Sequence, residues 1–214
     1  MLQEFTQQVE DTARAVMNEI HTALPGNVLS FNPSTGTATV KPEGKYVLSN
    51  GKKLDYPTIT EVPVVFPYCQ SGGVGVAFPV VKGDSCIIII SEVELDEWRS
   101  GAESEAPLRF DLSSALCIPG LLDGGSDLVQ KANKKNAVVI GAGDVEITVT
   151  SDEALVDTGS TKLSVTDSGV EITGNVKVKG NLTCTGVMKT NTSLNLNEHT
   201  HVSAAPGSDT GKPK

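Results

Sequence analysis

The last third of the chain, residues 137–201, places the strongest constraint on the fold. Short segments there alternate apolar with polar residues, and most of the apolar ones are β-branched. This period of two is typical of β-strands that bury one face, and glycines between the segments mark sharp turns. The tetrapeptide Val-Glu-Ile-Thr occurs at 145 and again at 170, a loose internal repeat. The predicted strands are residues 137–140, 145–149, 162–166, 170–173, 175–179 and 182–185.

A ribbon built from these strands alone would leave its apolar face uncovered. Residues 121–214 contain no Phe, Tyr or Trp that could cover it, and bare strand edges invite pairing with other chains. Intertwining several copies around one axis buries the face and pairs the edges. We therefore expect a homotrimeric, intertwined triple-stranded β-helix, because three faces form the smallest closed prism. An ordinary single-chain β-sandwich is the alternative.

Composition narrows the class of protein further. The 214 residues allow one large domain or two small ones. Aromatic residues make up 4% and hydrophobic residues 38% of the chain. This apolar content is low for one globular core and normal for an extended all-β protein. The net charge of −9 argues against nucleic acid as a partner, because phosphate binding needs a basic surface. The four cysteines form no CxxC motif, so we expect buried free thiols and assembly in a reducing cytoplasm.

The first 24 residues carry a helical pattern. Apolar residues recur every three or four positions, and Pro25-Gly26 ends the pattern. The helix could pack on its own domain or meet its copies around a shared axis, and we prefer packing at the boundary between this domain and a partner. The repeating positions are Leu2, Phe5, Val9, Thr12, Val16, Ile20 and Leu24.

Residues 28–91 contain five or six short strands with glycine-rich corners, which suits a small barrel of the OB type. The apolar run from residue 87 to 90 predicts a strand buried on both faces. This barrel lacks the basic, aromatic-lined face that oligonucleotide binding needs. The predicted organisation is an N-terminal helix (1–24), an OB-fold collar with a following linker region (25–125), a linker (126–136), a β-helix shaft (137–190) and an apex (191–214).

The apex contains a candidate metal site. His199 and His201 are two apart, so in a strand their side chains face the same way. One chain offers two imidazoles, but three chains around an axis offer six, and octahedral nitrogen ligation suits Fe(II), Co(II) or Ni(II) rather than zinc. The small residues of the tail, 203–211, would fold tightly over such an ion. The alternative is an accidental, solvated His-x-His.

Several motifs carry a resemblance to a known family. They are Val62-Pro-Val-Val-Phe-Pro67, Phe78-Pro79 followed by Gly83-Asp84, Trp98 with Gly101, and the run from Arg109 to Leu121. Together they resemble the N-terminal domain of the central spike proteins of contractile phage tails and related injection machines. The resemblance implies a trimer with an OB-fold collar, a triple-stranded β-helix and an apex that holds iron. It implies one Fe ion per trimer with six His ligands, two from each chain, here His199 and His201.

No arrangement of residues points to catalysis, so we expect no enzyme. The hypothesis is a membrane-piercing spike of the virion, placed at the baseplate tip of the tail and assembled in the host cytoplasm. Its OB-fold domain would attach to the baseplate hub protein, and sheath contraction would drive it into the bacterial outer membrane and envelope. A β-helical receptor-binding fibre or adhesin is the alternative, and a His-x-His metalloenzyme is the third reading. The metalloenzyme would need further ligands, and no His or Glu follows His201.

Overall fold

The computed structural model of the chain describes residues 2–48, 51–102, 109–122 and 124–189. The described chain is mostly β with few helices, and it begins with a short helix, as the sequence predicted. It divides into two compact units, Met1–Ser126 and Asp127–Lys214. No described helix is both long enough and apolar enough to cross a membrane.

Helix α1 spans Leu2–Glu19, and its side chains from residue 3 to 17 are all exposed. The prediction of a helix up to residue 24 was wrong at its end, because Ala23 and Leu24 already belong to strand β1. The backbone N–H of Ile90 donates to the carbonyl of Thr22 at 2.9 Å, and Leu24 pairs with Ile88. Strand pairing therefore overrides the helical spacing of the apolar residues at this point.

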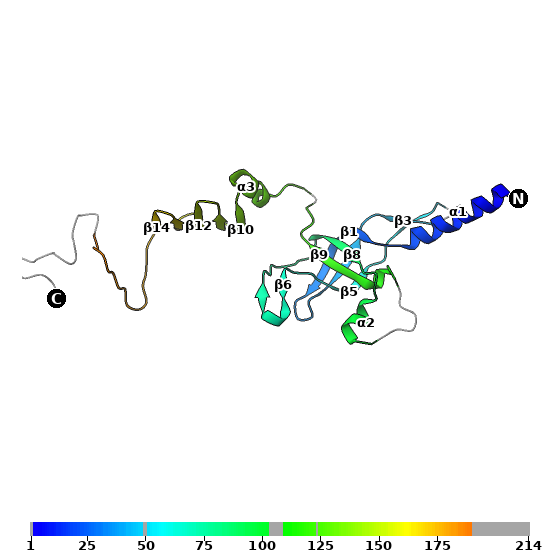
Figure 1. Ribbon diagram of the computed structural model, residues 1–214, viewed down its shortest axis with the longest axis horizontal. Helices are drawn as coiled ribbons and strands as arrows, with labels where there is room; N and C mark the ends of the chain where they lie inside the picture. Colours follow the sequence, from blue (N-terminus) through cyan, green and yellow to red (C-terminus); the bar gives the residue numbers. More distant parts are fainter. Residues whose placement is uncertain (1, 49–50, 103–108, 123, 190–214) are drawn as a thin grey trace, which may run out of the picture. The chain divides into compact units, whose positions relative to one another are not determined.

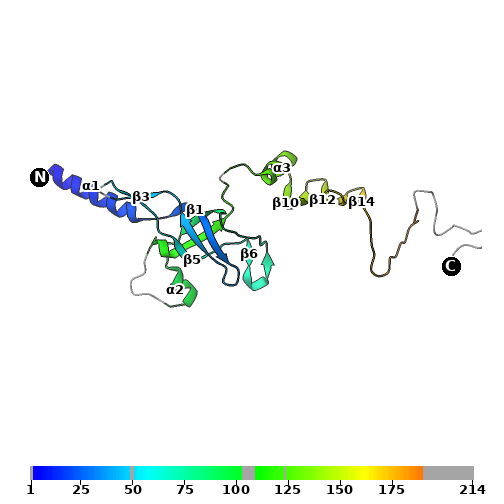
Figure 2. The same cartoon turned by 180° about the vertical axis from the view of Figure 1, so that it is seen from behind.

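The first unit is built on a curled five-stranded sheet (Figures 1 and 2). Every pair of neighbouring strands is antiparallel, in the order β5-β2-β1-β8-β9. The two outer strands approach each other through a parallel bridge between Val64 and Cys117 and a 2.8 Å hydrogen bond from the N–H of Val65 to the carbonyl of Cys117. The sheet is thus a half-barrel. Its strands are β1 (Ala23–Asn32), β2 (Thr37–Pro42), β5 (Ile59–Pro63), β8 (Ser85–Ile90) and β9 (Ala115–Pro119).

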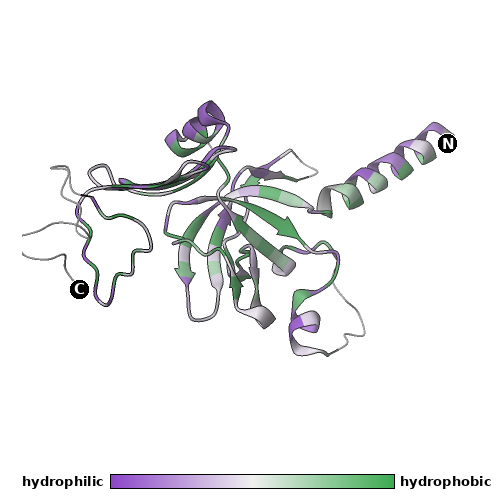
Figure 3. Cartoon of the chain, turned by 60° about the vertical axis from the view of Figure 1, so that its left-hand side comes forward, coloured by the Kyte–Doolittle hydropathy of each residue, from purple (hydrophilic) through white to green (hydrophobic). Residues whose placement is uncertain are grey.

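The hydrophobic core lies on the concave side of this sheet. Burial alternates along β8, where Ile88 and Ile90 are buried but Ile87 and Ile89 are only half-buried. The prediction that this strand is buried on both faces was therefore wrong, because only the inner side meets other core residues. In Figure 3 the strands of this unit are rich in hydrophobic residues. The buried apolar residues are Val28, Ala38, Val40, Ile59, Val62, Val80, Cys86, Ile88, Ile90, Ala115 and Cys117.

Smaller elements decorate the curled sheet. Two hairpins are formed by β3 (Lys45–Val47) with β4 (Lys53–Asp55), and by β6 (Tyr68–Cys69) with β7 (Val74–Gly75). The rings of His21, Tyr46 and Tyr56 pack edge-to-face with centroids 5.5–6.3 Å apart, which ties the first hairpin to the start of β1. The remaining elements are the 3-10 turns η1 (Gln70–Gly72) and η2 (Leu112–Ser114) and the helix α2 (Leu95–Ser100).

The second unit contains a five-stranded antiparallel sheet in sequential order, which we call the meander sheet. It follows helix α3 (Asp127–Lys135), which occupies most of the segment expected to be a linker. Four of its strands lie where the sequence predicted strands, and β12 was not predicted. The strands are β10 (Val138–Ala142), β11 (Val145–Val149), β12 (Glu153–Asp157), β13 (Lys162–Thr166) and β14 (Gly169–Thr173).

The chain continues beyond β14 without further strands up to residue 188. The strands predicted at 175–179 and 182–185 are therefore absent from the described single chain. Val176, Val178 and Leu182 in this stretch are 62%, 49% and 67% exposed. The four cysteines are free, as expected, but only Cys86 and Cys117 are buried, whereas Cys69 and Cys184 are exposed.

Candidate functional site

The register of the meander sheet gathers most of its apolar residues on one side, the apolar face. Side chains alternate between the two sides of a strand, so residues two apart share a side. The register aligns these residues across all five strands into two continuous rows. One row is Ile140, Ile147, Val156, Leu163 and Ile172, and the other is Val138, Val149, Ala154, Val165 and Val170.

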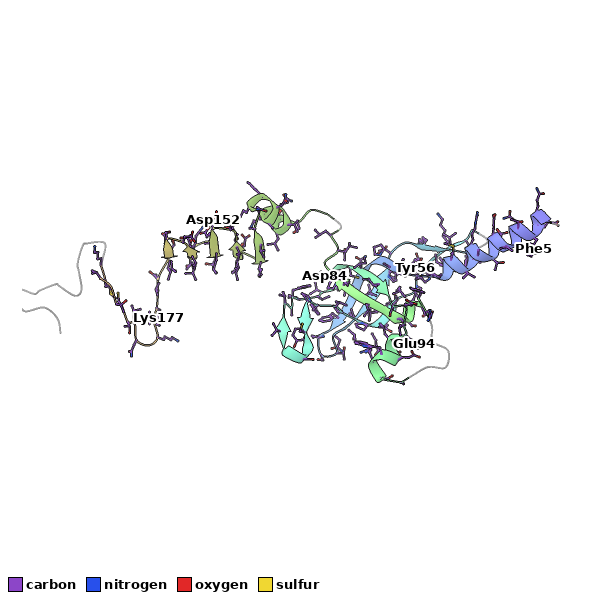
Figure 4. All side chains as sticks on the ribbon, viewed as in Figure 1. Phe5, Tyr56, Asp84, Glu94, Asp152 and Lys177 are labelled. Carbon is purple, nitrogen blue, oxygen red and sulfur yellow. The ribbon has the colours of Figure 1, made fainter. Side chains whose placement is uncertain are left out.

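This apolar face is open to solvent in the single chain. Apart from the half-buried Val156, its large side chains are exposed to fractions that range from 38% at Leu163 to 65% at Val138 and Val170. On the opposite side of the sheet, by contrast, the polar Thr148 is only 5% exposed. Seen edge-on in Figure 4, the strands carry side chains on both sides. The unit therefore exposes its apolar side and partly covers its polar one, the reverse of the usual pattern for a sheet with one solvated face.

Helix α3 covers part of the polar side. A Cβ atom at Gly141 in β10 would lie 2.7 Å from Cδ1 of Leu128, so the helix packs closely on the strand at this glycine. Lys131 of α3 forms an ion pair with Glu146 of β11. The hydrogen bond to the Glu146 carboxylate raises the pKa of Lys131. The helix is thereby held on the side away from the apolar face.

Cross-strand polar contacts also lie on the polar side of the meander sheet. Lys162 Nζ lies 2.9 Å from a carboxylate oxygen of Asp157, directly across from it in the register. The hydrogen bond from Lys162, with a second one from the N–H of Gly159 at 2.7 Å, lowers the pKa of Asp157. These contacts fix the alignment of β12 with β13, and hence the continuity of the apolar rows.

The repeated Val-Glu-Ile-Thr tetrapeptide takes an equivalent position in two strands. Ile147 in β11 and Ile172 in β14 lie in the same apolar row, whereas Glu146 and Glu171 lie on the polar side. The repeat therefore reflects the alternation that the sheet needs at both places.

The metal ligands predicted from the sequence, His199 and His201, lie outside the described residues, as does the tail from 203 to 211. Within the described part of the chain, no group of three or more His, Cys, Asp or Glu side chains could hold a metal ion. Sequence reasoning missed β12, whose signal is weak because Ala154, Leu155 and Val156 are three consecutive apolar residues and hide the alternation.

The first unit also exposes apolar side chains. Tyr68 and Val74 on the β6–β7 hairpin are 52% and 71% exposed, and Trp98 on α2 is 75% exposed. Aromatic residues are enriched where proteins contact partners. The hairpin and α2 are therefore two further candidate surfaces for an interaction.

Residues 24–120 match the family model described as the phage protein Gp138 N-terminal domain. The match indicates a protein related to phage tails and baseplates. It spans the curled sheet from β1 to β9 and agrees with a component of the virion. No curated protein matches the chain significantly.

Proposed function

We propose that the chain is a homotrimeric, membrane-piercing spike at the tip of a contractile tail. The OB-fold domain attaches it to the baseplate hub protein, and sheath contraction drives it into the bacterial outer membrane and envelope. The observation that carries this proposal is the exposed apolar face of the meander sheet. The match of residues 24–120 to a phage protein domain supports a role in a phage tail or baseplate.

Burial of the apolar face gives a sufficient driving force for association. Nine large apolar residues of the sheet are at least 38% exposed in one chain. Removing the exposed part of each from water contributes roughly 1 kcal/mol, so the total is on the order of 10 kcal/mol for each chain. The cost of lost translation and rotation on association is about 4–15 kcal/mol, and three chains share the gain along the length of the sheet.

Two further features support intertwining. Strands β10 and β14 are the edges of the meander sheet, and unpaired strand edges are templates for a neighbouring chain. Residues 175–179 keep a strand-like alternation, Val176 and Val178 against Lys177 and Lys179, yet form no strand within one chain. Pairing with the neighbouring copies would give hydrogen-bond partners to the edge strands and to residues 175–179, as a triple-stranded β-helix requires.

The curled sheet supports the OB-fold collar. Five antiparallel strands in the order β5-β2-β1-β8-β9, drawn together at one end by the parallel bridge between Val64 and Cys117, agree with a partly open Greek-key barrel of this class. The exposed Tyr68, Val74 and Trp98 offer an aromatic and apolar surface for the hub.

The apex would hold one Fe ion per trimer through His199 and His201 of each chain. Six imidazole nitrogens are a donor set that suits Fe(II). The ion would hold the three chains together at the apex. The spike needs no catalytic group, because the contracting sheath supplies the energy and the shaft only has to stay stiff.

The mass of the purified chain in solution tests the trimer. Sedimentation equilibrium should give three times 22.4 kDa, and sedimentation velocity should show an elongated particle. A monomer at micromolar concentration would contradict the spike, since no described part of the second unit covers its apolar face.

Elemental analysis tests the apex separately. The wild-type trimer should contain one iron ion, and the His199→Ala/His201→Ala double variant should contain none while its mass stays that of a trimer. Equal iron content in both proteins would reject the ligand assignment without affecting the shaft.

A further inference from the structure

Helix α1 carries a second unpartnered apolar stripe, separate from the meander sheet. Phe5, Val9 and Val16 are 67%, 52% and 57% exposed. With Leu2 and Thr12 of the same helix they are spaced three, four, three and four residues apart, which averages 3.5 rather than 3.6 residues per turn. A period of 3.5 is the pattern of helices that wind around one another in a left-handed coiled coil. In heptad notation Val9 and Val16 occupy the a positions, and Phe5 and Thr12 occupy the d positions.

The one polar residue of the stripe is compatible with such a seam. The hydroxyl of Thr12 donates a hydrogen bond of 2.8 Å to the carbonyl of Gln8 in its own helix. Because this satisfies the hydroxyl within the helix, its burial in a helix interface would not leave an unmet donor. The γ-methyl group of Thr12 can then pack beside Val9 and Val16 of the neighbouring helices.

The charged residues of α1 before Glu19 lie away from the stripe, and Glu19, the last residue of the helix, takes a d position. All four in the part of the helix with described side chains occupy the outer b, c and f positions. The e and g positions, which flank the seam, are instead small or uncharged. Hydrophilic and hydrophobic bands are both visible along α1 in Figure 3, and Figure 4 labels Phe5 on the same helix. The outer charged residues are Glu4, Glu10, Asp11 and Arg14, and the flanking ones are Thr6, Gln8, Ala13 and Ala15.

We propose that the α1 helices of three copies form a parallel coiled coil on the molecular axis. This inference rests on the proposed homotrimer and adds a second contact between its chains, at the opposite end of the chain from the shaft. Three copies fit better than two, because a third helix buries more of the e and g positions, which carry no charge here. The helices are parallel because each one leads into the same β1 strand of its own chain.

The coiled coil also explains how α1 can be stable. A helix of 18 residues is about 27 Å long, and isolated helices of this length are marginal in water. With residues 3–17 exposed, no described part of its own chain stabilises α1 by packing. Trimerisation through the shaft would raise the local concentration of the helices, and burial of the seam would then hold them in the helical state.

Disulfide trapping in the full chain tests this arrangement. The background carries Cys69→Ser and Cys184→Ser, which removes the two exposed thiols. Val9→Cys places a thiol on the seam, and the matched control Gln7→Cys places one on the outer f position. Oxidation with copper phenanthroline at low protein concentration should give a covalent dimer from Val9→Cys and none from Gln7→Cys. Circular dichroism should show the same helix content in both.

Sedimentation of the same two variants separates this inference from the proposed function. A trimer in which Val9→Cys forms no more covalent dimer than Gln7→Cys would overturn the coiled coil and leave the spike intact. A monomer would instead overturn the homotrimer, and the coiled coil with it.

Discussion

Leu163 lies directly across from Ile172 in the register of β13 and β14, and their side chains remain 38% and 48% exposed. The same relationship recurs in each pair of neighbouring strands, so the apolar face is continuous from β10 to β14. Large exposed apolar surfaces are rare on soluble monomers and commonly mark sites of interaction. Neighbouring copies of the chain are the partner that the spike proposal assigns to it.

A charge on the apolar face should prevent assembly. We expect Ile172→Lys to shift the protein from trimer to monomer, because three buried ammonium groups near one axis would have no partners. The measurement is sedimentation equilibrium at micromolar protein concentration.

Glu171→Lys is the matched control, since residue 171 lies beside Ile172 but on the polar side of the same strand. It introduces the same side chain and should leave the trimer intact. If both variants dissociate, the effect is one of charge or strand stability, and the apolar face is not the interface.

The backbone of the curled sheet should not tolerate a side chain at Gly26. A Cβ atom there would lie 2.5 Å from Cδ1 of Ile88 and 2.8 Å from the carbonyl oxygen of Lys41. Because Ile88 is fully buried and the Lys41 contact is with backbone, relief requires the strands to move. We expect Gly26→Ala to cost about 1–3 kcal/mol, seen as a lower urea midpoint at fixed protein concentration.

Gly124→Ala provides the comparison, because a Cβ atom at that position would meet nothing within 4 Å. Its midpoint should equal that of the wild type. An unchanged midpoint in Gly26→Ala as well would mean that β1 does not lie as closely against β2 and β8 as described.

The buried thiols should resist alkylation in the folded protein. Cys86 and Cys117 are 0% exposed, and a hydrogen bond with Cys86, followed by burial, raises the pKa of Cys117. Since the thiolate is the reactive form, iodoacetamide should modify Cys69 but neither buried cysteine, as measured by peptide mass spectrometry. In urea all four cysteines should react. Modification of Cys117 under native conditions would contradict the burial of the core.

The turn before β9 should give a pH-dependent stability. The hydroxyl and the backbone N–H of Ser113 donate to Asp111 at 2.7 and 2.8 Å and lower the pKa of this carboxyl group. Because the pKa is lower in the folded state, the stabilisation is complete above the unfolded value of about 3.9 and disappears as the pH falls through the folded value.

Asp111→Ala should therefore cost about 1 kcal/mol at pH 7, as the loss of a capping residue does, and clearly less at low pH. Ser113→Ala removes only the hydroxyl donor and keeps the N–H, so its cost should be smaller. Chemical denaturation at several pH values measures both, and a cost for Asp111→Ala that is independent of pH would exclude the proposed role of the carboxylate.

Much of the architecture could be predicted from local patterns. The short strands of the first unit and four strands of the meander sheet follow from alternation and turn residues, which act over a few positions. The predictions from the sequence were wrong where contacts between distant segments determine the local structure. Ala23 and Leu24 continue a helical spacing but pair with β8, and α3 forms where a polar stretch indicated only a linker, because it packs on β10 through Leu128 and Gly141.

The sequence by itself determined which residues are apolar and at what period, and hence that residues 138–149 and 162–173 form strands with one apolar side and that α1 is amphipathic. Only the tertiary structure decided that α3 covers the polar side of the meander sheet through Leu128 and Lys131, so that the apolar side stays open. The physical reason is that periodicity is a property of neighbouring residues, whereas coverage depends on contacts between segments far apart in the chain or in other chains.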